Sequence, residues 1–152
     1  MKKIGDILNF IRTKDFTVVN PNLGSGSFGK TVLLKDEQLD NMLLVAKKYE
    51  PQQITDQKAF YKNFVEEVKI LLNLNHRNIV RIYDWWLYPE YHKGFITMEY
   101  IDGCNLRQYL NKFSPKYSPS SINDIFRQII DAFCYIENKK IIHRDIKENN
   151  IL

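Results

Sequence analysis

The spacing of hydrophobic residues changes from helical to strand-like within the first third of the chain. Residues 3–13 predict a short amphipathic helix that packs on the following domain, because apolar side chains recur every three or four positions, at Ile4, Ile7, Leu8 and Ile11. Beyond Phe16, short apolar runs separated by turns rich in Gly, Asp and Asn predict three strands, at residues 16–19, 31–34 and 42–46. Their short connections favour antiparallel pairing.

A long amphipathic helix is predicted over residues 57–73. Its apolar stripe comprises Phe60, Phe64, Val68, Leu71 and Leu74. At about 100° per residue, Glu67 falls in the middle of this stripe, whereas Glu66 falls outside it. Because an unpaired buried charge is costly, Glu67 either has a basic partner or turns out to solvent.

The second half of the chain predicts two more strands, at residues 79–87 and 94–100, and two helices, at residues 106–112 and 120–138. The aromatic run Tyr83–Tyr88 either packs in the core, which is the preferred interpretation, or marks a partner surface. Ser120 or Ser121 can cap the last helix. This helix has a wide apolar face made of Ile122, Ile125, Phe126, Ile129, Ile130, Phe133 and Ile136.

Composition adds that the chain is soluble and globular. It has 152 residues, of which 44% are hydrophobic and 26% charged, enough for one domain with a substantial core. The net charge of +4 comes from scattered Lys and Arg residues, with no basic block that would indicate nucleic-acid binding. Cys104 and Cys134 lack the spacing of a metal site or a disulfide framework. With no signal-peptide or membrane-spanning run, a cytoplasmic protein without membrane contact is expected.

A glycine-rich segment, Gly24-Ser25-Gly26-Ser27-Phe28-Gly29, is the first candidate for chemistry. Glycines let the backbone approach phosphates closely and point amide N–H groups at them. A strand rather than a helix follows, which disfavours a Rossmann dinucleotide site, and the closing G-K-[ST] of a Walker loop is missing. Taken alone, the segment is equally compatible with a simple hairpin turn.

The third predicted strand carries a Val45-Ala46-Lys47-Lys48 segment. A lysine on this strand could reach the phosphates of a nucleotide held under the glycines. Strand alternation sends Val45 and Lys47 to one face of the sheet, and Ala46 and Lys48 to the other. Counting from Val-Ala against the kinase pattern V-A-I-K selects Lys48. A surface pair of lysines is the alternative interpretation.

The sequence ends in His143-Arg144-Asp145-Ile146-Lys147-Glu148-Asn149-Asn150-Ile151-Leu152, which matches the spacing H-R-D-L-x-x-x-N. Asp145 could accept a proton from an attacking hydroxyl, Lys147 could neutralise a transferring phosphoryl group, and Asn150 could offer its carbonyl oxygen to Mg²⁺. His143 is a lone histidine and is expected to pack or hydrogen-bond rather than bind a metal.

Together these motifs resemble the N-terminal part of a eukaryotic-type serine/threonine protein kinase catalytic domain, from Phe16 to Leu152. The resemblance implies an α+β fold with an antiparallel five-stranded N-lobe sheet and one long helix, followed by the first helices of an incomplete helical C-lobe. It divides the chain into an N-terminal helix packed on the N-lobe (1–14), the N-lobe and hinge (15–101) and the start of the C-lobe (102–152). Lys147, two residues after Asp145, is similar to the serine/threonine pattern.

The resemblance implies ATP and Mg²⁺ as cofactors and a protein as substrate. In the nucleotide-binding part, it assigns Lys48 to the phosphates and to an ion pair with Glu67, and it assigns adenine to the backbone of Glu99 to Ile101. The other positions that it implies are the phosphate-covering Gly24, Gly26 and Gly29, the gatekeeper Met98, and Asn105 near the ribose. In the catalytic loop it makes Asp145 the base, Lys147 the phosphate contact and Asn150 the Mg²⁺ ligand.

The sequence departs from the family at two places. Thr31 stands where the family has a Val that packs on adenine, so either the strand is shifted or Thr serves instead. The sequence given stops before the Asp-Phe-Gly motif, the activation loop and the Ala-Pro-Glu motif, so a truncated chain of doubtful activity is expected. The alternatives are an inactive nucleotide- or partner-binding kinase fragment and, disfavoured by Arg144, a small-molecule kinase. No pattern indicates an oligomeric state.

Overall fold

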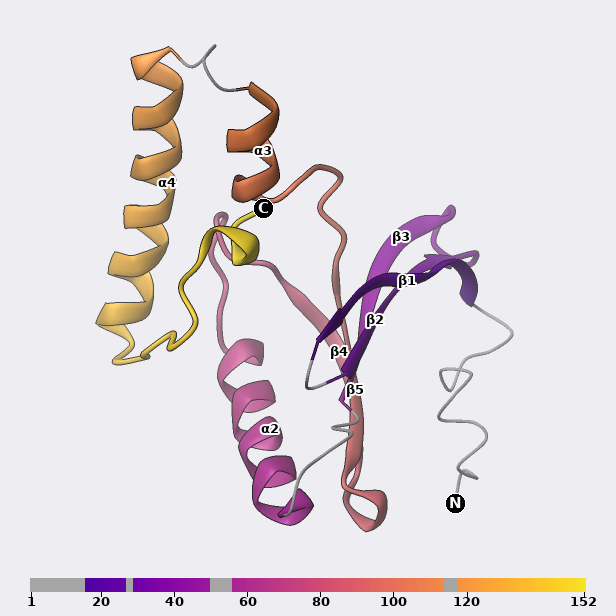
Figure 1. Cartoon of the computed structure of the whole chain (residues 1–152). Helices are drawn as coiled ribbons and strands as arrows, with labels where there is room; N and C mark the ends of the chain where they lie inside the picture. The colour runs from indigo at the N-terminus through magenta and orange to yellow at the C-terminus, as the bar shows by residue number, and fades with distance from the viewer. Residues whose placement is uncertain (1–15, 27–28, 50–55, 114–117) are drawn as a thin grey trace. The chain divides into compact units, whose positions relative to one another are not determined.

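The computed structural model describes residues 16–26, 29–49, 56–113 and 118–152 (Figure 1). The helix predicted over residues 3–13 lies outside these ranges. The chain divides into two compact units. One contains the residues up to Leu74 together with Arg81–Tyr100, and the other contains Asn75–Val80 and Ile101–Leu152.

A five-stranded antiparallel sheet forms the first unit, which confirms the predicted sheet. Its strands are β1 (Phe16–Gly26), β2 (Gly29–Asp36), β3 (Met42–Tyr49), β4 (Ile82–Tyr88) and β5 (Lys93–Glu99), in the spatial order β1-β2-β3-β5-β4. Strand β4 begins three residues later than the sequence predicts, because Ile79 is held in a turn by a 3.0 Å hydrogen bond from its N–H to the His76 carbonyl. A short 3₁₀ helix, η1 (Pro89–Tyr91), joins β4 to β5.

Helix α2 (Gln57–Leu72) packs on one face of this sheet. Asp56 caps its start by accepting a hydrogen bond from the Ala59 N–H at 2.9 Å. Its buried side chains are Tyr61, Phe64 and Val68, each contributing roughly 1.5–3 kcal/mol by burial. The buried face is therefore centred nearer Tyr61 than the sequence predicts, and Glu67 lies at its flank rather than in its middle.

The opposite face of the sheet has its own apolar clusters. Val32, Leu34, Leu44 and Ala46 are buried together, and Phe16 packs against them. A second cluster joins Tyr88 and Phe95, with Trp86 and Tyr91 beside them. The aromatic run of β4 is thus divided: Trp86 and Tyr88 pack in this cluster, whereas Tyr83 and Trp85 are 43% and 45% exposed.

The second unit contains α3 (Leu106–Phe113), α4 (Pro119–Asn138) and the short 3₁₀ helix η2 (Glu148–Asn150). Ser118 caps α4 by accepting from the Ser121 N–H, so the predicted caps Ser120 and Ser121 are wrong by two and three residues. The segment Asn75–Val80 binds α4. Its bonds include the Asn75 N–H to the Tyr135 hydroxyl at 2.9 Å and Arg77 to Asp131 at 3.1 Å.

Among the residues that the structure describes, no helix has the length and apolar character needed to cross a membrane.

Candidate functional site

The two lysines near the end of β3 lie on opposite faces of the sheet. Lys47 is opposite Ile96 of β5, and Ile96 belongs to the core that packs on α2. Lys48 is opposite Phe95, which belongs to the aromatic cluster on the other face. Because residues directly opposite each other on paired strands share a face, Lys47 faces α2 and Lys48 does not.

Glu67 of α2 forms an ion pair with Lys47. The Lys47 Nζ and Glu67 Oε1 atoms are 4.0 Å apart, and the two side chains are 42% and 55% exposed. The sequence predicts Lys48 as the partner of Glu67, whereas the ion pair that the structure shows is made by Lys47. The signal that could have found it is the alternation itself, because Lys47 shares its face with Tyr49, which packs on α2.

Thr31 lies directly opposite Lys47 across the β2–β3 pair. This pair runs in continuous register from Gly29 opposite Tyr49 to Asp36 opposite Met42, without a bulge. Thr31 therefore shares a face with Lys47, and the next residue, Val32, lies opposite Ala46 on the other face.

The glycine segment forms the β1–β2 hairpin, and residues 27–28 at its tip lie outside the described part of the chain. Gly29 has a φ of 149°, in the region that side chains disfavour, so glycine is required there by the backbone. A Cβ added to Gly24 would meet nothing within 4 Å. Packing within the described part of the chain therefore does not demand a glycine at position 24, which leaves room for a bound group to approach.

The chain passes between the two compact units at three places, and the last of them, between Tyr100 and Ile101, falls within the segment predicted as the hinge. Met98 lies opposite Val45 of β3 and packs against the α2 core, so it is on the same face as Lys47. The Glu99 N–H donates to the Arg81 carbonyl at 2.9 Å. This bond fixes the end of β5 just before the chain leaves the first unit.

The catalytic-loop residues converge on Asp145. Lys147 Nζ lies 2.9 Å from Asp145 Oδ2, and the Asn150 amide nitrogen donates to the same oxygen at 2.9 Å and to the Asp145 carbonyl at 2.8 Å. The Asp145 N–H donates to His143 Nδ1 at 3.3 Å, which gives His143 a hydrogen-bonding role. Arg144 has a φ of 66°, a left-handed conformation that turns the chain sharply before Asp145.

These contacts set the charge of Asp145. Hydrogen bonds from Lys147 and Asn150 hold the pKa of the Asp145 carboxyl below its ordinary value of 3.8, against an opposing effect of desolvation. The group is therefore a carboxylate at neutral pH. A carboxylate of lowered pKa can orient a hydroxyl by accepting its hydrogen bond, whereas a strong general base has a pKa near the working pH.

Asn150 is suited to hold a hard cation. Both hydrogen bonds shown for its side chain use the amide nitrogen, so the oxygen Oδ1 remains available as a ligand. Within the described ranges, no group of three or more His, Cys, Asp or Glu side chains could enclose a metal. Mg²⁺ is compatible with this arrangement, because it takes one or two protein oxygens and completes its shell with waters and phosphates.

Helix α3 holds the segment that follows Asp145 in place through two contacts. Arg107 pairs with Glu148 of η2 at 2.8 Å, and the Leu106 N–H donates to the Ile151 carbonyl at 2.8 Å. Asn105 caps this helix, because its side-chain oxygen accepts a hydrogen bond from the Gln108 N–H at 2.9 Å. In return, the Asn105 N–H donates to the side-chain oxygen of Gln108 at 3.1 Å. The structure thus gives Asn105 a capping function that the sequence interpretation did not assign.

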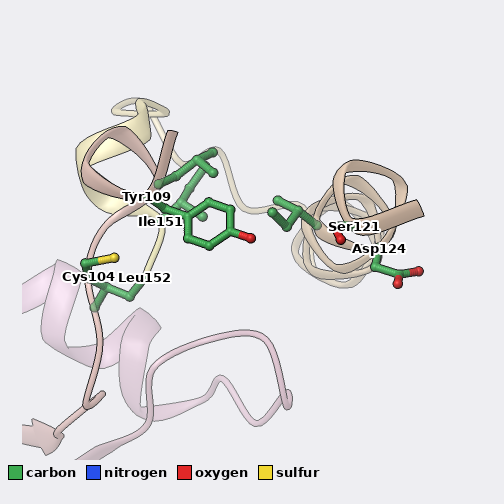
Figure 2. A pocket seen from close by; sticks show the side chains of 8 residues that line it. Cys104, Tyr109, Ser121, Asp124, Ile151 and Leu152 are labelled. Carbon is green, nitrogen blue, oxygen red and sulfur yellow. The ribbon is translucent and has the colours of Figure 1, made fainter. Parts of the chain in front are cut away.

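A cavity of about 420 Å³ lies beside these contacts, between α3, α4 and the last residues of the chain (Figure 2). Figure 2 shows Tyr109 and Ile151 on one side of it and Ser121 and Asp124 of α4 on the other. Of the predicted site residues that the structure describes, none lines this cavity. Its lining consists of Cys104, Leu106, Tyr109, Ser121, Asp124, Ile125, Ile151 and Leu152.

The candidate residues form two local groups. The first unit brings the predicted Glu67 and Met98 to one face of its sheet, together with Lys47 and Thr31, which the sequence analysis did not assign to the site. The second unit gathers Asp145, Lys147 and Asn150 around a single carboxylate.

Comparison with known proteins identifies the family of this chain. The family model described as "Protein kinase domain" matches residues 17–152. The serine/threonine-protein kinase PrkC of Bacillus subtilis is 34% identical over 130 residues, which cover 86% of this chain and 19% of that protein. The serine/threonine-protein kinase chk-2 of Caenorhabditis elegans is 34% identical over 146 residues, which cover 92% of this chain and 30% of that protein.

A solved structure supports the same fold. A mutant form of the PknI kinase domain of Mycobacterium tuberculosis superposes with a TM-score of 0.67 at 23% identity, covering 90% of this chain and 53% of that one. The chain spans less than a third of the length of PrkC and chk-2.

Proposed function

The chain belongs to the protein kinase domain family, and we propose that it supplies the nucleotide-binding and catalytic-loop residues for transfer of the γ-phosphate of ATP to Ser or Thr hydroxyls of proteins. The observation that carries this proposal is the cluster of Lys147 and Asn150 on the Asp145 carboxylate. Lys147, two residues after Asp145, supports the serine/threonine class, as does the similarity to the serine/threonine-protein kinases PrkC and chk-2.

In the proposed reaction, the oxygen of a substrate hydroxyl forms a bond to the γ-phosphorus while the bond from that phosphorus to the β–γ bridging oxygen breaks. ADP leaves with that oxygen. Asp145 accepts the proton of the hydroxyl, and Lys147 balances charge on the transferring phosphoryl group. The Asn150 side-chain oxygen would hold Mg²⁺, which would supply further charge neutralisation to the phosphates.

On the nucleotide side, we assign the phosphate-contacting role to Lys47 in place of Lys48. Lys47 is supported by its pairing with Glu67 and by its position opposite Thr31. Gly24, Gly26 and Gly29 would cover the phosphates, and the open space at the Gly24 Cα supports close approach of a ligand. The backbone of Glu99 to Ile101 would bind adenine, with Met98 behind it.

Phosphate transfer from γ-labelled ATP to a general protein substrate such as casein tests the proposal. The kinase for this assay is expressed from its complete gene. The wild-type protein should label serine and threonine in a Mg²⁺-dependent manner, and Asp145→Asn should reduce the rate by about 100-fold or more. The matched control is Asp124→Asn on α4, an exposed Asp that pairs weakly with Arg127 at 3.8 Å. Nucleotide binding without any transfer would favour the alternative of an inactive nucleotide-binding module.

A further inference from the structure

Tyr49 occupies a special place beside the Lys47–Glu67 pair. It follows Lys47 by two residues on β3 and therefore projects from the same face of the sheet. Its side chain is buried, at 5% exposure, and its ring stacks on Phe64 of α2, with centroids 4.4 Å apart and planes inclined by 8°. This stack fixes the position of the phenol ring against the helix.

The hydroxyl of Tyr49 is buried without a hydrogen-bond partner among the residues that the structure describes. A buried polar group that makes no hydrogen bond costs about 1–3 kcal/mol. The rest of the ring is well packed, so apolar burial does not explain why this position has a tyrosine instead of a phenylalanine. An acceptor within reach would explain it.

On α2, Glu67 is the carboxylate beside the face that packs on β3, where it pairs with Lys47. It lies three residues after Phe64 on α2, and residues at this spacing are neighbours on a helix surface. Burial raises the pKa of Tyr49 first, and the negative charge of Glu67 raises it further, so the phenol senses this carboxylate. The 4.0 Å separation of Lys47 and Glu67 exceeds the roughly 2.7–2.9 Å of a charge-assisted hydrogen bond, so Glu67 retains acceptor capacity.

We propose that Tyr49 is a positioning residue for the Lys47–Glu67 pair, with its hydroxyl donating a hydrogen bond to the Glu67 carboxylate and holding it toward β3. The carboxylate would then have two donors from one strand, Lys47 and Tyr49, separated by a single residue. The contact between Tyr49 and Glu67 stands on the packing of α2 on β3. Its consequence for catalysis rests on the proposed function.

An NMR titration of the pKa of Tyr49 tests the contact directly. The full chain is labelled with ¹³C at the tyrosine ring carbon that bears the hydroxyl, and Tyr49→Phe assigns the Tyr49 signal. The pKa of Tyr49 should fall toward its ordinary value in Glu67→Gln. It should stay unchanged in the matched control Glu66→Gln, because Glu66 points to Lys69, 2.7 Å away. Equal titration curves in both variants would overturn the proposal.

A double-mutant cycle at neutral pH gives a second measurement. Both Tyr49→Phe, which keeps the stacked ring, and Glu67→Gln, at a half-exposed site, are compatible with folding. The cycle should show coupling of about 3- to 10-fold in the unfolding equilibrium constant, whereas a cycle of Tyr49→Phe with Glu66→Gln should show none. Additive effects of Tyr49→Phe and Glu67→Gln would count against the contact.

Nucleotide binding separates this inference from the proposed function. Measured well below the melting temperature of each variant, Tyr49→Phe should weaken Mg²⁺–ATP binding about 3- to 10-fold, as expected for a residue that acts through Glu67. If Lys47→Met leaves ATP binding intact while Tyr49 still responds to Glu67, the proposed function fails and the contact stands. If ATP binding depends on Lys47 but not on Tyr49, the positioning role alone is wrong.

Discussion

Lys47 of β3 and Glu67 of α2 face each other across the packed surface between strand and helix, with 4.0 Å between Nζ and Oε1. Lys48, the next residue, projects from the opposite face of the sheet, across from Phe95. The face that α2 covers therefore decides which lysine can pair with Glu67. Because the pair is half-exposed, we expect it to orient the Lys47 side chain while adding little to the stability of the fold.

Glu67→Gln tests this orientation. We expect Mg²⁺–ATP binding or phosphate transfer to fall by about 10-fold, while the free energy of unfolding changes by less than about 1 kcal/mol, because exposed ion pairs stabilise proteins little. Isothermal calorimetry and chemical denaturation measure the two quantities. Glu66→Gln, which removes an exposed i,i+3 pair with Lys69, is the control, and equal losses in both variants would contradict the account.

Much of the fold can be predicted from local patterns, because each strand and helix follows the spacing of its own apolar residues. The exceptions depend on tertiary packing. Alternation places Lys47 and Lys48 on different faces, but only the position of α2 shows which face is covered, and a shift of one residue in counting reverses the assignment. The buried face of α2 shifts toward Tyr61 for the same reason, because Tyr61 packs beside Phe64.

The catalytic loop is better predicted, because its contacts are local. Asp145, Lys147 and Asn150 lie within six residues of each other, so their spacing alone nearly determines that they meet. The cap of α4 can be predicted only in part. Three serines precede or begin this helix, and only the structure shows that Ser118 is the one that accepts the backbone hydrogen bond.

The titration of Asp145 gives a prediction about pH. Lys147→Ala and Asn150→Ala should each raise the pKa of Asp145 toward its ordinary value of 3.8, because each removes a hydrogen bond to the charged form. The pKa is lower in the folded chain, so the stability linked to it is present above the ordinary value and is lost as pH falls through the folded value. NMR of the Asp145 carboxyl carbon measures it, with Arg127→Ala as a control. An unchanged pKa in Lys147→Ala would contradict the geometry.

Gly94 tests the packing of α2 on β5. An added Cβ at this position would lie 2.5 Å from Phe64 Cε1 and 3.1 Å from the Trp86 carbonyl oxygen, so the close approach of helix and sheet requires glycine. Gly94→Ala should reduce the free energy of unfolding by about 1–3 kcal/mol. Gly103→Ala, where an added Cβ meets nothing within 4 Å, should change the free energy of unfolding very little. Urea titrations of both variants measure the two changes. Equal stability of the two variants would show that the packing is looser than described.

Ser118 tests the start of α4. Ser118→Ala removes the acceptor of the Ser121 N–H and should cost about 1 kcal/mol of helix stability. Ser120→Ala removes a hydroxyl contact with Ser118 and should cost less than half as much. Thermal melts followed by circular dichroism compare them, and a larger loss in Ser120→Ala would place the cap elsewhere.

The most direct measurement of the central claim compares Lys47→Met with Lys48→Met in Mg²⁺–ATP binding and phosphate transfer, at matched thermal stability. Lys47→Met should lower transfer by about 100-fold or more, the loss typical of a group that stabilises charge in the transition state. Lys48→Met should stay within about 3-fold of wild type, because Lys48 lies on the face away from α2. A large loss in Lys48→Met with Lys47→Met unaffected would contradict the account.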